Sequence, residues 1–330
     1  MKAVCTITLI ILLLSSTSRF GISLTPQPNA GVALLTQPKG AVKISRGHHT
    51  ETLADDALLN VGDVVTIAAD GGAVIYQAYA PVKRLVANEN LTVKTLSPPP
   101  QGSALTLEEF GSFKRNYLIA HQNRHNLSPI TQGGSEDANL TLLEPRNSFI
   151  LDGKPTFVWT RAANATKYVV NIYDGNEKVV CSQSTTDLKL LYPSACNPLE
   201  PGAYKWDVTA QIGDKVSDDP ALYDATSFAR PDLTQTGDIV SAVQHAQTIS
   251  ESDIAARSVY AATLLEHHLY PQAEVELLRS LRDDPADQAL WALLIETYFQ
   301  MKRWPAREKA RKISVADHLT PQMVWTLNKR

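Results

Sequence analysis

This 330-residue chain contains three pairs of closely spaced histidines, and such pairs could bind a metal ion. His121 and His125 stand four residues apart in a stretch expected to be helical, which puts both imidazoles on one face. A zinc protease of the H-E-x-x-H type also needs a glutamate directly after the first histidine, and Gln122 stands there. We therefore predict a solvated helix face at this position and no metal site.

The other two histidine pairs consist of adjacent residues, His48-His49 and His267-His268. Neighbouring residues of a strand point to opposite faces, so His48 and His49 are not expected to chelate one ion and are placed in an exposed turn. His267 and His268 fall at the end of an expected helix, where the helix dipole favours imidazolium. Neither pair is predicted to bind metal.

Acidic residues offer another route to catalysis, because a glycosidase needs little more than two carboxylates. Asp214, Asp218 and Asp219 lie close together but are expected to cap an exposed loop. The sequence has no serine-hydrolase elbow, phosphate-binding loop or dinucleotide-binding fingerprint. We predict a protein that is not an enzyme and has no catalytic, cofactor-binding or metal-binding residues.

The N-terminus has the profile of a signal peptide over residues 1–23. Lys2 precedes an apolar run at 4–14, and serine and threonine follow at 15–18. The run is shorter than the roughly 20 apolar residues of a membrane-spanning helix. We therefore expect an exported chain, periplasmic or in the cell envelope, that is not an integral membrane protein after cleavage.

Removal of residues 1–23 would leave two cysteines, Cys181 and Cys196. An even number of cysteines in an oxidising compartment predicts a disulfide between them. Such a crosslink is worth about 2–3 kcal/mol for a loop of this length. Two buried thiols remain the alternative, because spacing alone does not show that the two Cβ atoms face each other.

Charge bounds the kind of partner. Lys and Arg number 31 against 34 Asp and Glu, a formal net charge of −3, which excludes the basic footprint of a nucleic-acid-binding protein. Positive charge is concentrated only near the C-terminus. The candidate partner-binding residues there, for an acidic peptide or surface polymer, are Arg303, Arg307, Arg311 and Lys312. A solvated face is the alternative reading of this run.

Residues 31–96 alternate apolar and polar residues in short runs, which predicts a small antiparallel β-domain. The expected strands are 41–44, 63–67, 73–76 and 82–86. Segments 39–47 and 58–63 resemble the opening strand and the following turn of FecR-type domains of bacterial envelope proteins. Gly62 and Gly72 are expected at positive φ. The resemblance implies a ligand- or partner-binding module without catalytic residues.

A linker and a helix are predicted over 97–140. Consecutive prolines within 97–103 favour extended structure and mark a domain boundary. The helix is expected over 105–125, with Thr106 as its N-cap and Glu109 three residues further on.

Residues 141–230 predict a β-sandwich with strands at 154–159, 167–173, 178–181, 188–192 and 199–210. Trp159 and Tyr168 are expected in its core, and by period two Trp206 shares a face with Tyr204. The segment resembles the fibronectin type III, immunoglobulin-like sandwich. That resemblance implies that Tyr204 forms a tyrosine corner, in which its hydroxyl bonds back to the main chain.

Residues 238–330 are predicted to form helical hairpins, because the apolar period becomes helical from 253 onward. The pattern resembles tetratricopeptide repeats if Pro285 closes a 34-residue unit. The matching positions are Tyr260, Ala261, Leu264, Tyr270, Ala273 and Leu277, then Trp291, Leu294 and Tyr298. Two units are fewer than a solenoid usually needs, so we expect these helices to pack on the sandwich, on further copies or on a partner.

The sequence thus predicts a multidomain fold: a small all-β domain, an immunoglobulin- or fibronectin III-like sandwich, and tetratricopeptide-like hairpins. The predicted function is that of an exported scaffold that docks a protein or peptide partner through its helical repeat, without cofactors. A carbohydrate- or peptidoglycan-directed binding protein or enzyme is the alternative.

Overall fold

The computed structural model describes residues 31–94, 104–125, 140–212, 215–217, 227–251, 256–316 and 318–327. The side chains of 121–125, 212 and 215–217 are outside this description. The predicted signal peptide at 1–23 and the proline-rich stretch at 97–103 also lie outside the described residues. None of the described helices has the length and apolar character needed to cross a bilayer.

The first β-domain consists of two four-stranded sheets in which all neighbouring strands are antiparallel. One sheet has the order β4 (Ala57–Leu59), β1 (Ala33–Lys39), β6 (Gly72–Gln77), β7 (Lys83–Leu85). The other has the order β3 (His49–Leu53), β2 (Val42–Arg46), β5 (Val64–Ile67), β8 (Asn90–Thr92). Gly62 has the expected positive φ of 93°, whereas Gly72 has none and instead starts β6, where it pairs with Lys39.

Strand β1 was not expected from the sequence because its apolar residues run on without alternation. The reason is that the sheet containing β1 and β6 is buried on both faces. Leu35 and Ile75 belong to the core between the two sheets, whereas Leu34 and Tyr76 pack among helices on the opposite face. Because successive side chains of a strand point to opposite faces, β1 and β6 each contribute residues to two hydrophobic cores.

The second β-domain places two sheets face to face. One sheet has the order β14 (Lys189–Leu191), β11 (Thr156–Trp159), β9 (Leu142–Glu144). The other has β10 (Ser148–Phe149), β17 (Ser227–Arg230), β15 (Gly202–Ile212), β12 (Lys167–Asp174), β13 (Val179–Thr185), with β16 (Lys215–Ser217) on β15. The predicted core aromatics are buried between the sheets: Trp159, Tyr168, Tyr204 and Trp206.

Two interactions predicted for this domain are present, a hydrogen bond of Tyr204 and a disulfide. The Tyr204 hydroxyl donates to the carbonyl of Glu200 at 2.7 Å, which is the geometry expected of a tyrosine corner. Cys181 and Cys196 form a disulfide with their Cα atoms 5.8 Å apart, so the predicted pairing is confirmed. Cys181 lies on β13, and Cys196 lies in the chain after β14 of the opposite sheet.

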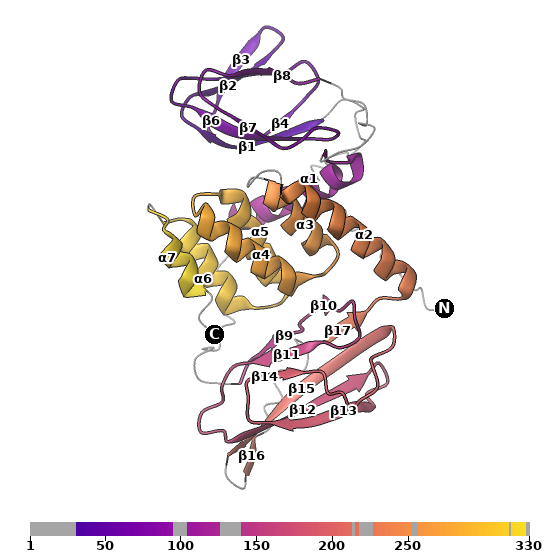
Figure 1. Ribbon diagram of the computed structural model, residues 1–330. Helices are drawn as coiled ribbons and strands as arrows, with labels where there is room; N and C mark the ends of the chain where they lie inside the picture. Colours follow the sequence, from indigo (N-terminus) through magenta and orange to yellow (C-terminus); the bar gives the residue numbers. More distant parts are fainter. Residues whose placement is uncertain are drawn as a thin grey trace, which may run out of the picture.

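After β17, the described residues form six helices: α2 (Leu233–Ser250), α3 (Arg257–Glu266), α4 (Tyr270–Asp283), α5 (Gln288–Gln300), α6 (Trp304–Ser314) and α7 (Pro321–Leu327). From α2 to α7, each helix packs on the next. Figure 1 shows these helices lying between the two β-domains. These helices, which follow both β-domains in sequence, therefore lie between them in space and form most of the helical domain.

Helix α1 (Leu107–His125), from the predicted linker region, belongs to this helical domain and packs on α3 and α5. Its N-terminus has the expected capping box: Glu109 N donates to Thr106 Oγ1 at 3.1 Å, and Thr106 N donates to the Glu109 carboxylate at 2.8 Å. Phe113 and Tyr117 are buried on one face of α1. The Phe113 ring lies 4.4 Å from the ring of Tyr76, so α1 also joins the first β-domain to the helices.

Candidate functional site

The candidate site is a groove of about 630 Å³ between the second β-domain and the hairpin of α3 and α4. The sandwich contributes residues on and around β10, and the hairpin contributes Tyr260, Pro271, Gln272, Val275 and Glu276. Apolar side chains form much of the wall: Pro145, Phe149, Ile150, Leu151, Pro155, Tyr260, Pro271 and Val275. Val275 is 61% exposed, which leaves an apolar side chain on α4 open to a ligand.

The charge of the groove is predominantly negative. Glu144, Asp152 and Glu276 line it together with one cation, Lys154. Burial raises the pKa of Tyr260, and the nearby Glu276 carboxylate raises it further, so this phenol stays protonated at neutral pH as a donor. An apolar groove with carboxylates favours a ligand that combines apolar and cationic groups.

A smaller hollow of about 330 Å³ adjoins the groove, since Tyr260 and Glu276 line both. Its other lining residues come from the end of α2 and from the outer faces of α3 and α4: Gln247, Ser250, Glu251, Arg257 and Arg279. Arg279 lies 3.8 Å from the Glu276 carboxylate. The lining changes from apolar beside the sandwich to polar beside α2.

Hydrogen bonds between the domains position the walls of the groove. The Phe149 amide donates to the carbonyl of His268 at 2.9 Å, and the two rings lie 4.9 Å apart. Arg146 donates to the carbonyl of Lys302, between α5 and α6, at 3.1 Å, and Asn147 donates to the carbonyl of Gln300, at the end of α5, at 3.0 Å. The sandwich is thus bonded to the helical domain after α3 and at the end of α5.

His268 is exposed at the end of its helix, as predicted, but the imidazolium form that was expected there is disfavoured. Its Nδ1 lies 2.5 Å from the Tyr270 hydroxyl. Burial lowers its pKa, and the neighbouring His267 lowers it further, against an opposing effect of Glu266. Contact with the rings of Phe149 and Tyr270 shields part of the imidazole from water, which disfavours its charged form.

The four predicted partner-binding residues fall into different environments. Arg303 is buried, and its guanidinium lies 2.7 Å from the carboxylate of Glu274, also buried. Arg307 is 5% exposed and stacks on two aromatic rings. Arg311 and Lys312 are more exposed and lie 2.7 and 3.7 Å from Glu308. Uniform exposure of the run, as a solvated face, is therefore wrong for Arg303 and Arg307.

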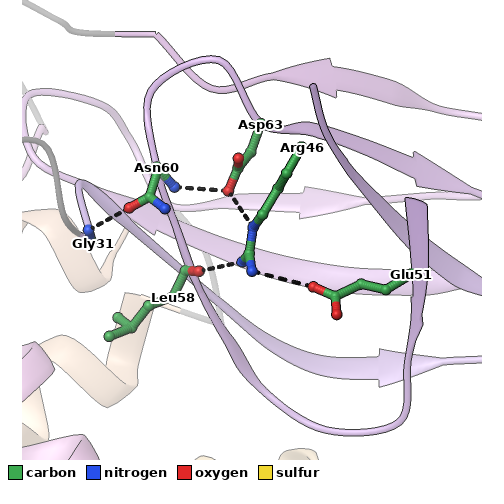
Figure 2. Close-up of polar contacts among 6 residues, drawn as sticks. All are labelled: Gly31, Arg46, Glu51, Leu58, Asn60 and Asp63. Atoms are coloured by element: carbon green, nitrogen blue, oxygen red, sulfur yellow. Dashed lines mark hydrogen bonds and ion pairs between the residues drawn. The ribbon is translucent and has the colours of Figure 1, made fainter. Parts of the chain in front are cut away.

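A second polar cluster joins the two segments that carry the FecR resemblance (Figure 2). Asp63 is buried and accepts from Arg46 Nε at 3.1 Å and from the main-chain N–H of Asn60 at 2.8 Å. Arg46 also donates to the carbonyl of Leu58 and lies 3.2 Å from Glu51. Because the Asp63 carboxylate is engaged within the domain, this cluster is structural and fastens the turn before β5 to the β2–β3 hairpin.

The structure describes only some of the other chemically suggestive residues. His48 is exposed between β2 and β3, in the predicted turn, and His49 begins β3. The side chains of His121 and His125, and the acids Asp214, Asp218 and Asp219, lie outside the described residues. Among the residues that are described, no group of three or more histidines, cysteines or acids could hold a metal ion.

The fold and the groove define a multidomain protein in which helical hairpins lie between antiparallel β-domains. No protein-family model matches the chain, and no curated protein matches it either. Among solved structures, it is similar to the crystal structure of dimeric latent PorU from Porphyromonas gingivalis at 9% identity and a TM-score of 0.23. The match covers 58% of this chain and 16% of that one.

Proposed function

We propose that this chain is an exported, non-enzymatic interaction protein of the cell envelope or periplasm that docks a protein partner through its helical domain. The observation that carries the proposal is the groove between β10 and the α3–α4 hairpin, with its apolar walls and exposed Val275. A FecR-like first domain, a fibronectin III-like sandwich and tetratricopeptide-like hairpins, all recurrent in binding proteins, are part of the same proposal.

The occupant that fits the groove is an extended partner segment with a basic side chain next to an apolar one. Three carboxylates line the groove against one lysine, so a cationic segment gains electrostatic attraction. Apolar residues from both domains would remove the neighbouring side chain from water. The surface that such a segment covers includes Val275, Tyr260 and Phe149.

Two variants of the full-length protein test this proposal in pull-downs from the native envelope, compared by mass spectrometry. Val275→Arg adds a cation to the groove wall, and Leu191→Arg makes the same change at an equally exposed strand residue outside it. We expect a partner that is recovered with wild type and with Leu191→Arg but lost with Val275→Arg. Equal recovery with both variants would exclude the groove.

The pull-down requires the full-length protein, because a fragment that ends at residue 235 would lack most of the helical domain. Phe113 and Tyr117 of α1, together with Tyr76 of the first β-domain, are buried in the same core as the helices that follow residue 235. Removal of those helices would expose these three rings to water, and capture by such a fragment would report on non-native apolar surface.

A carbohydrate- or peptidoglycan-directed role is the second candidate, favoured by the three carboxylates and Tyr260 that line one groove. Sedimentation with purified peptidoglycan, followed by analysis of released muropeptides, separates it from the first. If wild type binds peptidoglycan, Val275→Arg does not, and the pull-down recovers no protein, the ligand of the groove is a glycan and not a protein. Release of muropeptides would contradict the non-enzymatic proposal.

A further inference from the structure

Arg307 on α6 is a buried cation whose Nε has no hydrogen-bonding partner among the described residues. The residue is 5% exposed. Arg303, four residues earlier, is buried to the same degree but pairs with Glu274 at 2.7 Å. Since buried charges in proteins are normally paired, an unpaired guanidinium calls for a functional explanation.

Two aromatic rings hold this guanidinium in place. Its Cζ lies 5.0 Å from the ring centre of Phe299 and 5.8 Å from that of Trp304, and the two rings meet edge to face. Ring faces attract a cation but accept none of its five N–H groups as a carboxylate would. We call Phe299 and Trp304 the aromatic corner. Phe299 is 37% exposed, so this ring of the aromatic corner reaches the surface.

The two carboxylates whose charges act on Arg307 form hydrogen bonds to other side chains. Glu308 is bonded to Arg311 at 2.9 and 2.7 Å, and Glu296 accepts from Gln300 at 2.7 Å. Burial lowers the pKa of Arg307, an effect opposed by the charges of Glu296 and Glu308. Arg311 and Lys312 add positive charge on the same helix, so an arriving anion meets a cationic surface.

We propose that Arg307, between Phe299 and Trp304, is the recognition site for a carboxylate of an acidic peptide. An incoming carboxylate would accept two parallel N–H bonds from the guanidinium, a geometry that lysine does not reproduce. Apolar atoms beside that carboxylate would cover the exposed part of Phe299. The inference rests on the proposed function, because it takes the ligand to be a peptide. It places a second peptide-binding site on α5 and α6, away from the groove.

The test uses the full-length protein and hexaglutamate as the probe, with hexaglutamine as the uncharged control. We expect hexaglutamate to shift the Arg307 Nε–Hε signal in ¹H–¹⁵N spectra and to bind with a Kd below about 10 mM. Arg307→Lys should weaken binding about tenfold, because charge remains but the bidentate fork is lost. Arg311→Lys, with its side chain already bonded to Glu308, should change the Kd less than about twofold.

A second variant guards against misfolding of Arg307→Lys. Phe299→Leu removes one ring of the corner from a partly exposed position and should weaken hexaglutamate binding severalfold while leaving Arg307 in place. Equal affinity for hexaglutamine, an unshifted Arg307 signal, or equal effects of the two lysine substitutions would overturn the site. Because the probe is defined and Val275 is unchanged, none of these failures would count against the groove.

Discussion

The buried ion pair of Arg303 and Glu274 gives the sharpest prediction about stability. The two side chains are 6% and 2% exposed and their charged atoms lie 2.7 Å apart. Arg303→Gln would remove this cation from the buried Glu274 carboxylate, which also accepts from the Tyr298 hydroxyl at 3.2 Å. Removal of one partner of such a pair costs about 3–5 kcal/mol. For a domain of roughly 100 residues this lowers the Tm by at least about 10 °C.

Arg279→Gln is the matched control, because Arg279 also pairs with a glutamate on α4 but is 63% exposed. An exposed pair at 3.8 Å contributes about 0–1 kcal/mol. Thermal unfolding followed by circular dichroism at the helix band reports on this domain, since the described helices lie there. A Tm for Arg303→Gln that matches that of Arg279→Gln would refute the assignment of Arg303 as an internal structural residue.

Three further predictions concern the other parts of the molecule. Reduction of the Cys181–Cys196 disulfide should destabilise the second β-domain by about 2–3 kcal/mol in urea, and an unchanged midpoint would contradict this. Asp63→Asn should cost the first β-domain about 1–3 kcal/mol, and Glu51→Gln, at the exposed edge of the same cluster, less than about 1 kcal/mol. Burial raises the pKa of Asp287 to about 6, so its neutral form is favoured in the fold and stability should fall as pH rises from 4 to 6. Asp287→Asn keeps the N-cap acceptor of α5 and should remove that part of the pH dependence, which parallel urea titrations at each pH would detect.

Local sequence patterns correctly predict interactions between residues that lie close together in the sequence. Tyr204 and Thr106 form the predicted corner and capping box, because both interactions join residues within four positions of each other. The pairing of Cys181 with Cys196 is likewise predictable, since only two cysteines remain beyond the expected signal peptide.

Interactions between domains are much less accessible to sequence reasoning. Phe110, Phe113 and Tyr117 form an apolar stripe on α1 that is visible from their spacing, but nothing local indicates that α3 and α5 cover it. The groove joins residues near 150 to residues near 275, a pairing that only the assembled fold creates.

The basic run near the C-terminus shows the same limit. Arg303 and Arg311 look alike in sequence, yet one is buried against Glu274 and the other is bonded to Glu308 on its own helix. The aromatic residues Phe299 and Trp304 were the available indication that Arg307 is not simply solvated, because arginine stacks readily on aromatic faces.

Site-specific photo-crosslinking in the native envelope tests the central claim most directly. The photo-reactive amino acid p-benzoylphenylalanine would replace Val275 in the groove and, in a parallel sample, Leu191 on β14, at 61% and 66% exposure. Our account predicts a discrete protein adduct from the position of Val275 that is absent from that of Leu191, with the crosslinked peptide carrying a basic residue. Adducts of equal yield from both positions, or none from Val275, would contradict a docking groove between the sandwich and the helical domain.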